Sequence, residues 1–156
     1  MIKNYCLSIV SVVWSSVALA NEGMDFVAVA EMFSQCYGTA VAAEIILTEG
    51  GLTQNAQVIR ETGNGAFMSA AHLLYLNDIQ AGRTPKAAYG DYRPYINSIA
   101  EPFKNRILAE RELSEAAGTP EAQSAALESG LATCQMLSEL QVEIVSQIRQ
   151  NIHGVQ

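Results

Sequence analysis

TPEAQSAALESGLATCQMLSELQVEIVSQIRQNI, residues 119–152, is the longest uninterrupted helical pattern in the chain. It has a strong start signal, because Thr119 can cap a helix, Pro120 suits the first position and Glu121 meets the positive end of the helix dipole. Apolar side chains then recur at steps of three and four, which places them on one face: Leu127, Leu131, Cys134, Leu137, Leu140, Ile144, Val145 and Ile148. The stretch predicts a long amphipathic helix with a cysteine on its apolar face.

Residues 24–47 show the same periodicity near the other end of the chain. Their apolar face contains Phe26, Val29, Ala30, Phe33, Cys36, Tyr37, Ala40 and Val41. Gly50 and Gly51 should end this helix, since glycine readily takes the left-handed conformation found at helix C-termini. Gly38, with the small residues around it, predicts a patch where a neighbouring helix can approach closely.

Two further helical segments lie between these ends. One begins at Thr53 or Asn55, which are both plausible caps, and continues to Gln80. Glycines at 63 and 65 interrupt its pattern, and the sequence leaves open whether they bend one helix or separate two.

The third helix is expected from a cap at Asp91, with Pro94 in its first turn, to Gly118. No stretch alternates apolar and polar residues over six positions, which argues against a sheet. The prediction is an all-α fold: an antiparallel bundle of about four helices, with short connectors and one inter-helix disulfide.

The first 20 residues have the features of a secretory signal peptide. Lys3 gives a positive start, an apolar run follows, and Ala18-Leu19-Ala20 forms a small-x-small cleavage site. The run is shorter than the about 20 residues that a membrane-spanning helix needs. We therefore expect cleavage before Asn21, residues 21–156 to form a single domain, no stable membrane insertion after cleavage, and a periplasmic or secreted location.

Two cysteines remain after that cleavage, Cys36 and Cys134. An even number of cysteines in an oxidising compartment favours a disulfide. Closing a loop of ~100 residues is worth about 4.7 kcal/mol in the chain-entropy model. The pair is not a Cys-x-x-Cys motif, so we expect a structural role for the bridge rather than a redox role.

Charge and motif content exclude many functions. The chain has nine basic and sixteen acidic side chains, and an acidic protein is repelled by the phosphates of nucleic acid. Signature motifs of serine hydrolases, phosphate-binding loops and zinc proteases are absent from the sequence. The sequence therefore predicts no catalytic residues, no metal site, no cofactor and no nucleic-acid partner.

The two histidines offer limited chemistry. His72 has no acidic residue three or four positions away to orient it, so we expect a half-buried side chain satisfied by one hydrogen bond. A general base or a pH sensor is the functional alternative. His153, with Met24 or Met32, could in principle hold a haem non-covalently, but a histidine suits any helix C-terminus and methionines commonly fill cores.

The basic residues are concentrated in one segment. Residues 83–111 contain six of the eight basic residues that follow the cleavage site. Within this segment Tyr89, Tyr92 and Tyr95 recur at every third position around Arg93, and these two residue types are enriched at binding hot spots. If the segment is helical, the tyrosines share a side. We predict that these four residues contact a protein partner; the alternative is a connector whose rings cover the end of the bundle.

These features favour a small, non-enzymatic, protein-binding module such as an inhibitor, an immunity protein or a chaperone-like factor. Its partner would be another periplasmic or secreted protein. One alternative is a carrier of an apolar ligand or of non-covalent haem in the bundle core. Another is a hydrolase with an unrecognised site.

Overall fold

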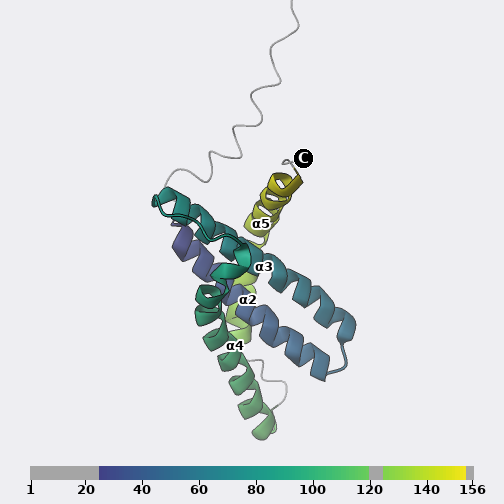
Figure 1. Ribbon diagram of the computed structural model, residues 1–156. Helices are drawn as coiled ribbons and strands as arrows, with labels where there is room; N and C mark the ends of the chain where they lie inside the picture. Colours follow the sequence, from purple (N-terminus) through teal and green to yellow (C-terminus); the bar gives the residue numbers. More distant parts are fainter. Residues whose placement is uncertain (1–24, 120–124, 154–156) are drawn as a thin grey trace, which may run out of the picture.

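The computed structural model describes residues 25–119 and 125–153, with side chains to residue 150. Its elements are the α-helices α2 (Phe26–Glu49), α3 (Thr53–Gln80), α4 (Arg93–Ala116) and α5 (Ala125–His153), and the 3-10 helix η1 (Tyr89–Tyr92) (Figure 1). The described residues include no strand. The all-α bundle of four helices with one inter-helix disulfide is therefore confirmed. The expected signal peptide, and the expected helix start at residues 120–121, lie outside the described part.

Helix α2 begins and ends through local sequence signals. The Oδ1 atom of Asp25 accepts hydrogen bonds from the backbone N–H groups of Val27 and Ala28, both at 3.0 Å. This contact satisfies two of the free donors at the helix N-terminus. After the last turn Gly51 has a φ of 76°, the left-handed conformation expected from the paired glycines.

Helix α3 is continuous, so the glycines at 63 and 65 do not separate two helices. Each glycine instead lies where another helix comes close. A Cβ on Gly63 would lie 3.0 Å from that of Ala40 in α2, and a Cβ on Gly65 would overlap the side chain of Gln141 in α5. The helix begins at Thr53, as expected, but its N-cap position is Leu52, which makes no side-chain hydrogen bond, so the predicted capping role of Thr53 or Asn55 is wrong.

Helix α4 starts after η1 rather than at the expected cap. The carboxylate of Asp91 accepts a hydrogen bond from the N–H of Ala88 at 3.1 Å and so stabilises the turn before the helix. Pro94 occupies the first turn of α4 as expected. Gly118, with a φ of 68°, follows the end of the helix.

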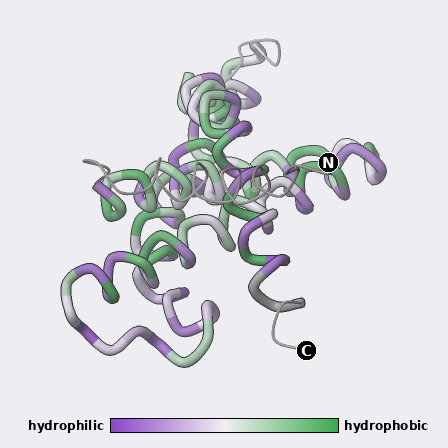
Figure 2. The backbone as a smooth tube through the Cα atoms, turned by 90° about the horizontal axis from the view of Figure 1, so that it is seen from above, coloured by the Kyte–Doolittle hydropathy of each residue, from purple (hydrophilic) through white to green (hydrophobic). Residues whose placement is uncertain are grey.

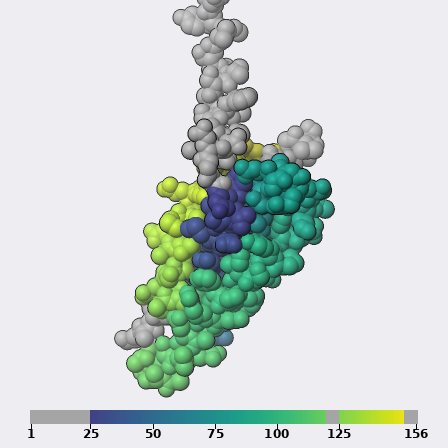
Figure 3. Space-filling model, turned by 90° about the vertical axis from the view of Figure 1, so that its left-hand side faces the viewer, coloured from purple at the N-terminus to yellow at the C-terminus, as the bar shows by residue number. Residues whose placement is uncertain are grey.

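The central helix of the bundle is α2, which packs against the other three helices. Figure 3 shows α2, in purple, between the yellow-green surface of α5 and the green surface of α4. In the contacts between α2 and α3, residue numbers increase in one helix as they decrease in the other: Tyr37 contacts Phe67, Ala40 contacts Gly63, and Glu44 contacts Arg60. In the contacts between α2 and α4, residue numbers increase in the same direction in both helices: Glu31 contacts Tyr95, Gly38 contacts Ala100, and Glu49 contacts Arg111. The helices therefore alternate in direction along the chain as far as α4.

The disulfide fixes α5 against α2. Cys36 and Cys134 form the bridge, with their Cα atoms 5.1 Å apart. Thr39 packs against Gly130 one turn further along α2 and one turn earlier in α5, so these two helices are antiparallel. A Cβ on Gly130 would lie 2.2 Å from the Thr39 hydroxyl oxygen. The crosslink therefore lies in a tight helix contact, and it joins the first described helix to the last.

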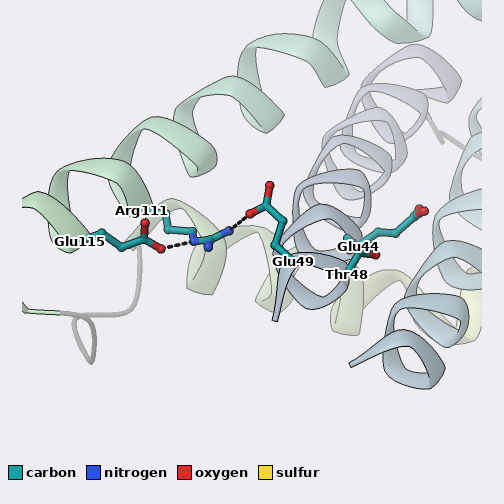
Figure 4. Close-up of polar contacts among 5 residues, drawn as sticks. All are labelled: Glu44, Thr48, Glu49, Arg111 and Glu115. Carbon is teal, nitrogen blue, oxygen red and sulfur yellow. Dashed lines mark hydrogen bonds and ion pairs between the residues drawn. The ribbon is translucent and has the colours of Figure 1, made fainter. Parts of the chain in front are cut away.

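A close approach also defines the contact between α2 and α4. A Cβ on Gly38 would lie 2.3 Å from the carbonyl oxygen of Ala100. The low-relief patch expected around this glycine is thus a helix-packing site. At the end of α2, Arg111 of α4 forms ion pairs of 2.6 Å with both Glu49 and Glu115 (Figure 4). Such exposed pairs contribute little stability, and the buried apolar cluster that includes Ala42 of α2 and Ile107 of α4 contributes more.

Candidate functional site

The candidate site lies where the connector 81–92 folds back onto α3. Much of this connector is an open loop at the edge of the molecule, pale or purple in Figure 2. Tyr92 attaches it to the bundle, because its ring is buried and its hydroxyl donates a hydrogen bond to Asp78 of α3 at 2.7 Å. The same hydroxyl accepts a hydrogen bond from the N–H of Lys86 at 3.1 Å. The last residue of the connector therefore bonds both to α3 and to the middle of the connector.

The polar groups at this attachment influence one another. The hydrogen bond from Tyr92, followed by that from Arg83, lowers the pKa of the Asp78 carboxyl. Burial is the main cause of the raised pKa of the Tyr92 hydroxyl. Both effects favour an ionised Asp78 that accepts from a neutral Tyr92 near neutral pH.

A second attachment joins His72 to Tyr89. The Nδ1 atom of the buried His72 ring lies 2.7 Å from the Tyr89 hydroxyl oxygen, in a hydrogen bond. The ring of Tyr75 stacks on His72, and its centroid lies 5.9 Å from that of Tyr89 in an edge-to-face contact. Burial lowers the pKa of His72. The histidine is thus held by one hydrogen bond, as expected, although it is buried rather than half-buried.

Arg93 and Tyr95 lie beyond these attachments and remain exposed. The guanidinium of Arg93 lies over the ring of Phe67, 4.5 Å from its centroid. The Tyr95 side chain is 39% exposed, and its hydroxyl donates to a carboxylate oxygen of Glu31 at 2.9 Å. No carboxylate of residues 25–119 or 125–150 forms an ion pair with Arg93. These two side chains are available to a partner without breaking a buried contact.

The structure therefore divides the four residues predicted to bind a partner. Tyr92 is buried and Tyr89 is half-buried, and both turn their hydroxyls towards α3. Arg93 and Tyr95 are on the surface. Tyr89 and Tyr92 lie in η1 and bond to α3, whereas Tyr95 lies in the first turn of α4 and bonds to Glu31 of α2. Contact with a protein partner stays a prediction, and the exposed pair is the part that could make it.

A groove between α3 and α5 was not predicted from the sequence. It has a volume of about 840 Å³ and opens beside the point where Gln141 crosses Gly65. Its lining combines apolar and polar residues of the two helices: Glu61, Asn64, Gly65, Met68, Gln141, Val142, Val145, Ser146, Ile148 and Arg149. The one sequence signal for it is Gly65, which permits the crossing. The helix periodicity does not reveal how far two helices diverge beyond such a point.

The structure describes only part of the histidine and methionine set that could hold a haem. Met24 and the side chain of His153 lie outside the described residues, whereas Met32 packs against the core cluster. Within the described ranges, no three histidine, cysteine or acidic side chains are grouped so that they could hold a metal ion. The described helices include none with the length and apolar character needed to cross a bilayer.

Comparisons with known proteins add no assignment. No family model matches the chain, and searches of curated proteins and of solved structures find no significant similarity. The functional argument therefore depends on the geometry of this molecule.

Proposed function

We propose that this protein is a periplasmic or secreted, non-enzymatic module that binds another protein through Arg93 and Tyr95. The observation that carries the proposal is the exposed guanidinium of Arg93. It lies over the Phe67 ring and forms no ion pair with a carboxylate of the described residues. Arginine and tyrosine are among the residues that most often dominate the energy of protein interfaces.

The support beneath this surface is rigid. Tyr92, directly before Arg93, is buried and has two hydrogen bonds through its hydroxyl. Tyr89 is fixed through His72. A contact surface that is already ordered loses less conformational entropy on binding, which favours affinity.

The charge of the surface indicates the kind of partner. Arg93, Arg83 and Lys86 lie close together in the sequence, and only Arg83 of these three forms an ion pair within the described ranges. The chain as a whole has a formal net charge of −7. A partner with an acidic patch would be attracted to this local positive region and repelled elsewhere, which favours one orientation.

Two features support the proposed compartment. The residue pattern at 1–20 favours export, and the bond between Cys36 and Cys134 fits an oxidising environment. An inhibitor, an immunity protein or a chaperone-like factor would suit both the compartment and the small size. A visible absorption spectrum of the purified protein distinguishes the haem-carrier alternative, because bound haem absorbs strongly in this range.

The test compares Arg93→Ala with a matched control, Arg106→Ala. Arg106 is also an exposed arginine of α4 that lies over an aromatic ring, 4.9 Å from the centroid of Phe103. Each tagged protein is used to capture partners from the extracytoplasmic fraction of the producing cells. We expect one protein to be captured by the wild type and by Arg106→Ala, but not by Arg93→Ala. Capture of the same proteins by both variants would contradict the proposal.

Melting temperature is measured on the same samples. An exposed cation–π contact is worth about 0.5–1 kcal/mol, so both arginine variants should remain folded. Lost capture with a nearly unchanged melting temperature would support a binding surface. A large fall in melting temperature of Arg93→Ala, with capture retained, would show that Arg93 is only structural.

A further inference from the structure

The connector between α3 and η1 presents open backbone to solvent. Residues 83–86 have no regular secondary structure, and bends follow at Ala87 and Ala88. Every residue of 81–88 except Pro85 is exposed, and the loop lies at the edge of the molecule (Figure 2). Ala88 has an extended backbone, with φ −135° and ψ 152°. Exposed loops with small and polar residues are the preferred sites of proteolytic cleavage, so this loop is a candidate protease site.

The basic residues of this loop indicate the class of protease. Among the basic residues of the described ranges, only Arg83 and Lys86 lie outside helices. Arg83 forms an ion pair of 2.9 Å with Asp78, whereas Lys86 is exposed and forms no ion pair in the part of the chain that the structure describes. Trypsin-like proteases bind a basic side chain through a carboxylate in their specificity pocket. Lys86 can enter such a pocket without leaving an ion pair, which favours cleavage of the bond between Lys86 and Ala87.

This bond is also easier to reach than the bonds within the helices. A protease that pairs with the backbone at Lys86 has to displace the hydrogen bond from its N–H group to the hydroxyl of Tyr92. A basic residue inside a helix becomes accessible only after several backbone hydrogen bonds have opened together. The difference predicts cleavage of the folded protein at the loop before any helix is cut.

Hydrogen bonds join residues that precede the Lys86–Ala87 bond to residues that follow it. The N–H group of Lys86 donates to the hydroxyl of Tyr92 at 3.1 Å, and this hydroxyl donates to Asp78 of α3 at 2.7 Å. Further back in α3, His72 bonds to the hydroxyl of Tyr89. These contacts can hold the two sides of the loop together after the peptide bond is broken.

The disulfide spans the same bond in the chain. Cys36 lies in α2, before the connector, and Cys134 lies in α5, after it. Helix α2 also packs against α4, which follows the connector. Cleavage in the loop would therefore leave residues 21–86 and 87–156 packed together and covalently linked.

We propose that the Lys86–Ala87 bond is a processing site for a trypsin-like protease, and that cleavage gives a two-chain, disulfide-linked protein that keeps its fold. The bond between the carbonyl carbon of Lys86 and the nitrogen of Ala87 breaks. A water molecule supplies a hydroxyl group to that carbon and a proton to that nitrogen. The new acid at Lys86 then ionises, and the new amine at Ala87 takes up the proton. This chain is the substrate, and the proposal does not depend on the binding of a partner through Arg93.

The first experiment is digestion of the folded protein expected after signal-peptide cleavage, residues 21–156, with a low concentration of trypsin. We expect one early product with the mass of the intact protein plus one water, which separates into residues 21–86 and 87–156 only after reduction. The segment 120–124 contains no lysine or arginine, so it cannot contribute a cut. Equally early cuts within the helices, or no cut until urea unfolds the protein, would overturn the proposal.

The second experiment locates the bond. Lys86→Gln should slow the first cut at least about tenfold, because glutamine has no charge for the specificity pocket of trypsin. Arg106→Gln, which changes an exposed arginine of α4, is the matched control and should be cut at the wild-type rate. Equal rates for both variants, or an early product that begins at Thr84, would contradict the assignment.

The third experiment tests whether the fold survives. The cut protein with its disulfide intact should melt cooperatively, at a temperature that does not depend on protein concentration. After reduction the two fragments are separate molecules, so the melting temperature should fall on dilution. Intact protein treated with the same reductant is the control and should show no dependence on concentration. Loss of cooperative melting on cutting alone would contradict a two-chain protein that keeps its fold.

The fourth experiment tests for processing in the producing cells. Wild type and Lys86→Gln are isolated from the extracytoplasmic fraction, and their masses are measured before and after reduction. We expect the two-chain form in the wild type, less of it when a serine-protease inhibitor is added to the culture, and none in Lys86→Gln. Wild-type protein found only as a single chain would show that the loop is not a processing site.

Discussion

Helix α3 presents two unlike faces to the rest of the molecule. On one face, His72 and Asp78 hold the connector through the hydroxyls of Tyr89 and Tyr92. On the other, α3 meets α5 closely at Gly65 and then leaves a groove of about 840 Å³. The first face is closed by directional hydrogen bonds, which form one arrangement. The second is closed at one point, where Gln141 of α5 packs on Gly65 and donates a long hydrogen bond of 3.5 Å to the carbonyl oxygen of Thr62, and the groove opens beside this point. The same helix can therefore support a rigid surface and an open site.

The largest effect should come from the crosslink that holds α5 in place. Changing Cys36 and Cys134 to serine together should lower the free energy of unfolding by about 2–5 kcal/mol. The loss of stability should be larger in α5 than in α3, because the bridge joins α5 to α2 and does not involve α3 or the connector. We expect amide hydrogen exchange to accelerate more in α5 than in α3.

Chemical denaturation and hydrogen exchange of the double serine variant check this prediction. Wild-type protein treated with a reductant is the control and should behave in the same way. Equal acceleration in α3 and α5 would show that the two faces of α3 are not held independently.

The connector face can be tested by removing one hydroxyl. Tyr92→Phe keeps the buried ring but removes the donor to Asp78 and the acceptor for Lys86. We expect a loss of about 1–2 kcal/mol in unfolding free energy, because partly buried polar groups lose a partner. Tyr95→Phe removes a hydroxyl from an exposed residue of the same segment and should change stability by less than about 0.5 kcal/mol. Equal effects in urea denaturation would contradict the division into buried and exposed tyrosines.

A smaller effect should appear as a dependence on pH. The unfolded chain binds a proton at His72 below about pH 6.5, whereas burial lowers the pKa of this group in the folded protein. Stability should therefore fall as the pH decreases from 6.5 towards the folded pKa, and the loss should level off below it. His72→Gln should weaken this dependence, which urea denaturation at several pH values measures. The same change at His153 is the control, and an identical pH profile for His72→Gln and the wild type would contradict the prediction.

Local signals in the sequence were sufficient for the helices and for the disulfide. Three- and four-residue spacing predicts the apolar faces, and two cysteines in an exported chain predict the bridge between Cys36 and Cys134, which the structure contains. The role of a glycine within a helix is harder to predict from the sequence. The helix stability that it costs is a local property, whereas the close packing that it permits depends on a neighbouring helix. The sequence pattern allows a break at Gly63, yet this glycine lies where α2 packs against α3 in a continuous helix.

The candidate site was only partly predictable for a similar reason. The basic, tyrosine-rich segment was visible from composition, but its division into buried and exposed residues depends on partners far away in the chain. Tyr89 bonds to a histidine 17 positions earlier, and Tyr92 bonds to an aspartate 14 positions earlier. The groove depends on the angle between α3 and α5, which the residue pattern of either helix does not specify.

Photo-crosslinking from the proposed surface tests the central claim most directly. A benzophenone amino acid replaces Tyr95 in one sample and, as a control, Leu113 in another; Leu113 is also exposed on α4, nearer the other end of this helix. Irradiation in the producing cells, followed by mass spectrometry, identifies any attached protein. The proposal predicts an adduct with one acidic partner from position 95 and none from position 113. No adduct from position 95, or the same adduct from both positions, would contradict it.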